Sequence, residues 1–146
     1  MFGLFRTLLT LLSIISCTVA NADLAIIVHP DYQGGELDKE MVRKIFLGEE
    51  QHFPSGHKAE PANHAEGSPD REYFFEYVLD MSESLHKRYW ARKVSAGKPG
   101  RPEELVSNKE VLNWIARTPL GITYIDKEKA DDTVKVLFTV TVFKDL

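Results

Sequence analysis

The sequence predicts an α/β domain in which a mixed β-sheet is flanked by helices. Two apolar runs rich in β-branched residues, at 24–28 and 134–143, are typical of strands. Between them, apolar residues recur at helical spacing after residues 38, 68, 82 and 107, which indicates amphipathic helices. Strand and helix patterns therefore alternate along the chain, as expected when helices pack on a sheet. Its 146 residues have the length of a single domain behind a short leader.

Residues 1–22 are predicted to be a signal peptide. One positive charge, Arg6, precedes an apolar run at 7–19, and Ala20-Asn21-Ala22 fits the small-residue cleavage pattern. The run is shorter than the roughly 20 apolar residues of a membrane span. We therefore expect a single domain at 23–146 that is periplasmic and does not insert into the membrane after cleavage. In an alternative interpretation, Cys17 is the lipidated residue of a lipoprotein, but it lies deep within the apolar run.

Composition excludes several kinds of function. The single cysteine lies in the leader, so the exported chain has no disulfide and no thiol nucleophile. The formal net charge is −4, and no basic stripe with interleaved aromatic residues is present. We therefore expect no binding to nucleic acid or to an anionic membrane surface.

The first half of the chain contains two predicted strands and one helix. The run at 24–28 is continuously apolar, which indicates a strand buried on both faces of the sheet. Gly34 and Gly35 form a loop that lets the backbone approach a ligand closely, although an ordinary turn explains them equally well. Asp38 caps a helix that ends before Gly48. Residues 58–63 are extended, and Pro61 favours a position at the sheet edge.

The second half contains three predicted helices and two strands. Ser68 is a good N-cap, and Pro69 suits the first helical position. A helix from Ser82 has an apolar face, and residues 92–103 form a basic loop that we interpret as solvated. Ser107 and Glu110 form a capping box for the last helix. Strands are predicted at 121–125 and 134–143. The apolar face expected for the helix from Ser82 consists of Leu85, Tyr89 and Trp90.

The start of the helix at Ser68 is the first candidate binding site. Unpaired backbone N–H groups and the positive end of the helix dipole favour an anion at such a position. An ordinary capped helix explains the local sequence as well.

Three stretches together resemble a known family. They are the strand at 24–28 with a helix ending I-F-L-G at 45–48, the E-G-S turn at 66–68, and L-G-I-T-Y-I-D at 120–126. This order resembles the phosphate-type substrate-binding proteins of bacterial ABC importers, a branch of the type II periplasmic binding proteins. Full members have two lobes that close on the ligand, whereas this chain has the length of about one. The resemblance implies a single-lobe type II periplasmic-binding-protein-like domain.

The resemblance also implies which residues contact a ligand. Family members hold phosphate with Arg, Asp, Ser, Gly and Thr, and these positions fall on His64, Glu66, Ser68, Pro69 and Asp70. Proline has no N–H to donate, and a carboxylate at the helix start competes with a bound anion. The next residue is an arginine, whose guanidinium can bind an oxyanion in a bidentate way. The predicted ligand contacts are Ser68, Arg71, Asp70, Gly67, Glu66, His64, Gly34 and Gly35.

The expected function is recognition of a small anion, such as phosphate, for ABC-type uptake or sensing. Its expected partner is an ABC permease or a sensor ectodomain. The alternative is an interaction module that has lost the ligand and docks on an envelope transporter or sensor. No enzyme activity, metal or cofactor is expected. His52, His57 and His64 lack a diagnostic metal-binding spacing such as H-E-x-x-H, and Ser68 with His64 lacks the G-x-S-x-G pattern of a hydrolase.

Overall fold

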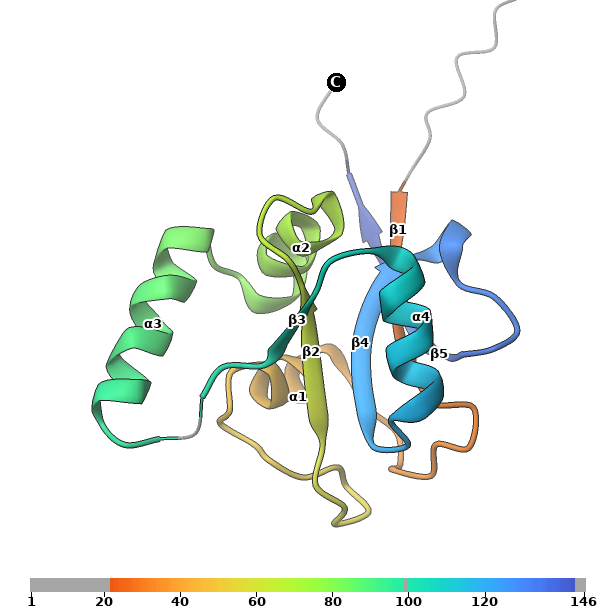
Figure 1. Ribbon diagram of the computed structural model, residues 1–146, viewed down its shortest axis with the longest axis horizontal. Helices are drawn as coiled ribbons and strands as arrows, with labels where there is room; N and C mark the ends of the chain where they lie inside the picture. Colours follow the sequence, from red (N-terminus) through yellow and green to blue (C-terminus); the bar gives the residue numbers. More distant parts are fainter. Residues whose placement is uncertain (1–21, 99, 144–146) are drawn as a thin grey trace, which may run out of the picture.

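The structure is a computed structural model that describes residues 22–98 and 100–143. Five strands form one mixed sheet in the order β3-β2-β4-β1-β5 (Figure 1). The strands are β1 (Ala22–Val28), β2 (Glu60–His64), β3 (Glu103–Leu105), β4 (Gly121–Asp126) and β5 (Lys135–Val142). The predicted signal peptide lies outside the described residues except for Ala22, and so does Cys17. The predicted mixed sheet flanked by helices is confirmed.

Helices cover both faces of this sheet. They are α1 (Lys39–Phe46), α2 (Pro69–Phe74), the π-helical continuation η1 (Phe75–Leu79), α3 (Glu83–Ser95), α4 (Asn108–Arg117) and the short 3-10 helix η2 (Lys127–Lys129). The buried apolar residues of α1, α2 and η1 belong to one core cluster, whereas those of α4 belong to a second. In Figure 1, α4 lies in front of the sheet and α3 stands to one side of it. No helix in residues 22–98 and 100–143 combines the length and the apolar character needed to cross a bilayer.

Strand β1 shows why its sequence is apolar without interruption. Successive side chains of a strand point to opposite faces. Leu24 and Ile26 therefore belong to the core cluster under α1 and η1, while Ala25 and Ile27 belong to the cluster under α4. All four are at most 1% exposed. The predicted strand buried on both faces is confirmed.

The strand directions separate the two ends of the sheet. Strand β2 runs parallel to β4, with Glu60 opposite Gly121. Strand β1 runs antiparallel to β4, with Leu24 opposite Asp126. The carboxyl ends of β2 and β4 therefore meet at one end of the sheet, and the loop that follows β1 leaves from the other end.

The position predicted for residues 58–63 was wrong. Strand β2 is not at the edge, because it lies between β4 and the short strand β3. Strand β3 pairs only with residues 62–64 of β2, so the proline at 61 lies before the paired segment on that side. This arrangement accommodates a residue that has no N–H to donate.

Side-chain caps begin three of the helices as predicted. Asp38 Oδ1 accepts from the Met41 amide at 2.7 Å, and the Ser82 and Ser107 hydroxyls accept amides at 3.2 and 3.1 Å. Glu110 closes its capping box on the amide of Val106 and not on that of the N-cap residue.

The apolar face predicted for α3 was partly wrong. Leu85 is 39% exposed, and the buried residues of this helix are His86 and Trp90. Tyr89 is partly buried. A histidine therefore occupies the place on the buried face that the sequence pattern gave to leucine.

Candidate functional site

The turn between β2 and α2 presents an open backbone surface. Gly67 has a φ of +91°, and no atom lies within 4 Å of an added Cβ there. Ser68 is the N-cap residue as predicted, but its hydroxyl makes no cap bond. Within the described chain, the amides of Asp70 and Arg71 donate to no protein acceptor. The turn can therefore offer a hydroxyl and free amides to a ligand.

His64 lies behind this turn as a buried core residue. Its ring Nε2 contacts the Tyr124 carbonyl oxygen at 2.6 Å, which makes Nε2 the donor. In a neutral ring, Nδ1 then accepts the Ser68 hydroxyl, 3.3 Å away. The ring stacks on Tyr124 with centroids 4.6 Å apart. Burial lowers the pKa of His64, so the ring is neutral near pH 7 and supplies no positive charge to an anion.

The Asp70 carboxylate is directed toward the end of β4. Its Oδ2 accepts the amide of Asp126 at 3.0 Å and lies 3.9 Å from His64 Nδ1. This side chain therefore joins α2 to the sheet. Its negative charge nevertheless remains beside the turn, where it opposes a bound anion.

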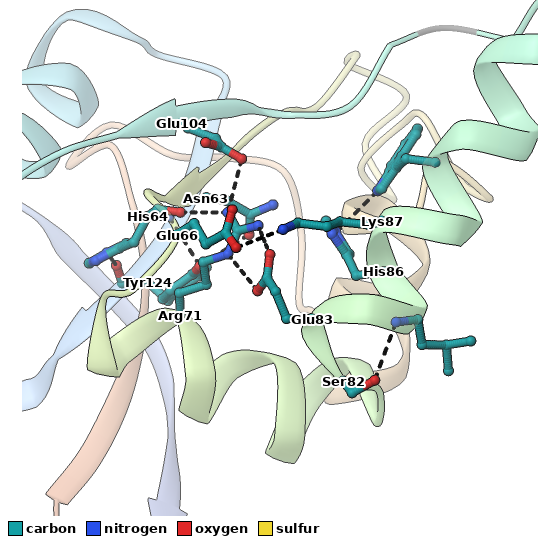
Figure 2. A network of polar contacts seen from close by, with 12 residues as sticks. Asn63, His64, Glu66, Arg71, Ser82, Glu83, His86, Lys87, Glu104 and Tyr124 are labelled. Atoms are coloured by element: carbon teal, nitrogen blue, oxygen red, sulfur yellow. Dashed lines mark hydrogen bonds and ion pairs between the residues drawn. The ribbon is translucent and has the colours of Figure 1, made fainter.

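Arg71 is buried and paired within the protein. Its Nε and Nη2 donate to the two oxygens of Glu83, the first at 3.0 Å. Its Nη1 donates to Glu104 Oε1 at 3.0 Å and to the His64 carbonyl at 2.8 Å. Figure 2 shows the guanidinium between the two glutamates. The sequence suggested this arginine as the counter-charge for a ligand, whereas the structure engages it with two carboxylates.

The pKa values of this ion network follow from its geometry. Burial by itself would lower the pKa of Arg71, but the hydrogen bonds to Glu83 and Glu104 outweigh burial, so the pKa is raised. The hydrogen bond from Arg71 lowers the pKa of Glu83. Arg71 and Glu83 are therefore both charged near pH 7, and the guanidinium is shared between two carboxyl groups.

The remaining predicted residues lie farther from the turn or at its surface. Glu66 is exposed and pairs with Lys87 at 2.7 Å. Gly34 and Gly35 follow β1, at the opposite end of the sheet. Tyr32 donates its hydroxyl to the Gly35 carbonyl at 2.8 Å, and its ring lies against Gly34. The structure therefore brings together His64, Ser68, Asp70 and Arg71, whereas the two glycines lie apart from them, at the other end of the sheet.

Sequence reasoning missed the partners that complete this network. Tyr124 was expected in a strand, but not its contacts: its hydroxyl accepts the His64 amide at 3.1 Å and donates to Asn63. Glu83 and Glu104 had no distinguishing pattern, since each is one of many surface carboxylates. Among the described residues, no group of three or more His, Cys, Asp or Glu side chains is arranged to hold a metal ion.

Comparisons with known proteins identify the fold. No protein-family model matches the sequence, and no curated protein matches it. An ABC-type phosphate transport receptor from Vibrio cholerae matches with a TM-score of 0.62 at 14% identity, over 80% of this chain and 45% of that chain. A putative phosphate ABC transporter substrate-binding protein with bound phosphate, from Clostridium perfringens, gives 0.63 at 16%, over 79% and 44%. PstS from Borrelia burgdorferi gives 0.59 at 17%, over 80% and 47%.

The chain thus spans less than half the length of these structures. It has the fold of one part of a phosphate-type substrate-binding protein, with a mixed five-stranded sheet, as the sequence resemblance implied. Identities of 14–17% show a common fold and do not transfer a ligand.

Proposed function

We propose that this chain is an exported substrate-binding lobe that recognises a small anion, phosphate or a similar oxyanion, for ABC-type uptake or sensing. The observation that carries this proposal is the fold, which matches a phosphate transport receptor and a putative phosphate-binding protein over about 80% of the chain. The predicted signal peptide supports a periplasmic location. An ABC permease or a sensor ectodomain is the proposed partner.

The proposed contacts are at the turn between β2 and α2. The free amides of Asp70 and Arg71 donate to the anion, and Gly67 lets it approach the backbone. The Ser68 hydroxyl joins them by turning its one hydrogen from His64 Nδ1 to the anion. Glu66 and His64 border the same turn. Because Arg71 is neutralised by two glutamates and Asp70 adds a negative charge, we expect weak binding. A single open lobe also leaves one side of the anion in water.

Isothermal titration calorimetry of the purified protein without its signal peptide tests this function. Phosphate, sulfate and acetate are titrated separately at low ionic strength. We expect heat with phosphate or sulfate, reduced by Ser68→Ala and increased by Asp70→Asn, which removes the competing charge. Ser107→Ala, which changes the N-cap of α4, is the matched control and should leave binding unchanged. Absence of heat with all three anions would refute anion recognition.

The internal pairing of Arg71 favours a second candidate function. Arg71 is the only buried Lys or Arg among the described residues, and it pairs with Glu83 and Glu104. A lobe in which this cation is already paired is consistent with an interaction module that binds no ligand. Such a module would dock on an envelope transporter or sensor. Asp70→Asn separates the two candidates, because restoring anion binding by removing one charge is expected only of a substrate-binding lobe.

A further inference from the structure

A cleft of about 460 Å³ lies between α3 and the start of β2, and we call it the α3 cleft. It is bordered by the end of α1, residues 58–61, the second half of α3 and the chain that leads into β3. The turn between β2 and α2, which we call the anion turn, follows the carboxyl end of β2, whereas this cleft lies beside the amino end of β2. The α3 cleft is therefore a different place from the proposed anion site. Its volume falls within the range of small-molecule sites.

The floor of the α3 cleft is apolar and includes an aromatic ring. Ile45, Ala59 and Trp90 line it, and each is at most 6% exposed. The Trp90 indole N–H donates to His86 Nε2 at 3.1 Å, which fixes the orientation of the ring. Because that N–H is occupied, the small part of the indole that is exposed offers a ligand only apolar surface, beside Lys93 Nζ, which lies 5.6 Å from the ring centroid. Such a floor favours a planar apolar group.

The rim of the α3 cleft is basic in a chain of net charge −4. The four cations that line it are Lys58, Lys93, Lys98 and Arg101. In the part of the chain that the structure describes, no carboxylate lies within 4.0 Å of any of them. Lys93 instead donates to the Leu47 carbonyl at 2.7 Å. Lys58 and Arg101 are exposed at the mouth and remain available to an anion.

The two carboxylates in the α3 cleft are already engaged by protein donors. Glu50 Oε1 accepts the amides of Gln51 and His52, both at 2.9 Å. Glu103 Oε2 accepts the indole N–H of Trp114 at 3.1 Å. Neither glutamate neutralises the rim by direct pairing, so the positive charges exceed the negative ones in this cleft.

We propose that the α3 cleft binds a small organic anion in which a planar apolar group adjoins a carboxylate or phosphate. The apolar group covers Trp90 and the floor, and the charged group meets Lys58 and Arg101 at the rim. An inorganic oxyanion contacts only the cations of the rim and leaves the apolar floor in contact with water. A neutral aromatic compound satisfies only the floor. Both parts are required for appreciable affinity.

Titration of the purified protein with four probes tests this proposal. Phenyl phosphate and benzoate carry both parts, inorganic phosphate lacks the apolar group, and benzamide lacks the charge. Heteronuclear NMR follows the Trp90 indole signal, and the dependence of this signal on probe concentration gives each affinity at the α3 cleft separately from binding at the turn between β2 and α2. We expect phenyl phosphate and benzoate to shift the Trp90 signal and to bind about threefold more tightly than the other two, because the exposed area of the floor is small. Raising the salt concentration should weaken their binding.

Two double variants separate the effect of the cations at the rim from the effect of the protein's net charge. Lys58→Gln with Arg101→Gln should weaken phenyl phosphate binding about fivefold. Lys109→Gln with Arg117→Gln removes the same charge from the exposed surface of α4 and should leave affinity unchanged. Ser68→Ala should also leave the affinity at the α3 cleft unchanged. The proposal for the cleft and the proposal for the anion turn can therefore be refuted independently. Absent binding of both aromatic anions, equal affinity for inorganic phosphate, or equal losses in the two double variants would each overturn the proposal.

Discussion

Arg71→Met removes the guanidinium that joins three parts of the fold and keeps a long apolar side chain. The guanidinium binds Glu83 at the start of α3, Glu104 in β3 and the His64 carbonyl at the end of β2. If its role is structural, this substitution should destabilise the protein whether or not an anion is present. If its role is to contact a ligand, stability should change little.

The expected loss can be estimated from the burial of each partner. The Glu83 and Glu104 side chains are 31% and 38% exposed, so water can replace the arginine, and each pairing contributes about 1 kcal/mol at most. The buried His64 carbonyl loses its donor, which costs about 1–3 kcal/mol. The guanidinium also lies 4.6 Å from the Phe75 ring centroid, a contact of about 0.5–1 kcal/mol. We expect a total loss of about 3 kcal/mol in the free energy of unfolding.

Urea denaturation followed by circular dichroism measures this loss. Arg88→Met, at an exposed position of α3, is the matched control and should change the free energy of unfolding by less than about 0.5 kcal/mol. Arginine lowers the pKa of Glu83, so the stability from this pair is fully present above the carboxylate's unfolded pKa. It is lost as the pH falls through the folded pKa, so the difference between wild type and Arg71→Met should narrow in acid. Equal unfolding of the Arg71 and Arg88 variants at pH 7 would refute the structural role.

Three further predictions concern a cap, a histidine and a glycine. Ser107→Ala should cost about 1 kcal/mol in the same urea assay, because its hydroxyl caps an amide. The Ser68 hydroxyl caps no amide, so Ser68→Ala should lose only the bond to the buried His64 Nδ1, which also costs about 1 kcal/mol. Burial lowers the pKa of His86 from 6.5 to about 4, so the unfolded chain binds a proton that the folded chain excludes in this window. The free energy of unfolding should therefore fall by about 2 kcal/mol between pH 7 and 5, and less in His86→Gln. Gly121→Ala places a Cβ 2.9 Å from the Trp114 ring and 3.0 Å from the Thr118 carbonyl, and should lower the thermal midpoint, with a cost of about 2 kcal/mol. Gly100→Ala, which meets no atom within 4 Å, is its control.

The parts of the fold that can be predicted are those whose structure depends on residues close to them in the sequence. A strand buried on both faces must be apolar at every position, which made β1 recognisable. The cap at Asp38 and the left-handed Gly48 delimit α1 within ten residues. Strand β3 had no such signal, because it is three residues long and begins with two glutamates. Its pairing with β2, which placed Pro61 away from the edge, is a tertiary contact that no local pattern records.

The candidate site was less predictable because its contacts span long distances in sequence. Asp70-Arg71-Glu72 has the charge pattern of an ordinary first helical turn, yet the partners of Arg71 lie 12 and 33 residues later. The basic loop at 92–103 was interpreted as solvated. Its Lys98 and Arg101 are indeed exposed, but the structure places them at the mouth of a cleft whose floor comes from α1 and β2. Neither relationship follows from composition or spacing.

The buried arginine links the two places where we propose ligands. Helix α3 stands to the side of the sheet and is held at its start by the bonds between Arg71 and Glu83 (Figures 1 and 2). Farther along, Tyr89 and Lys93 both donate to the Leu47 carbonyl. These contacts fix Trp90 at the floor of the α3 cleft. The pairing that withdraws positive charge from the turn at Ser68 therefore also positions the helix that forms the cleft. The weak binding that we propose at the turn and the binding that we propose at the cleft would then have the same structural cause.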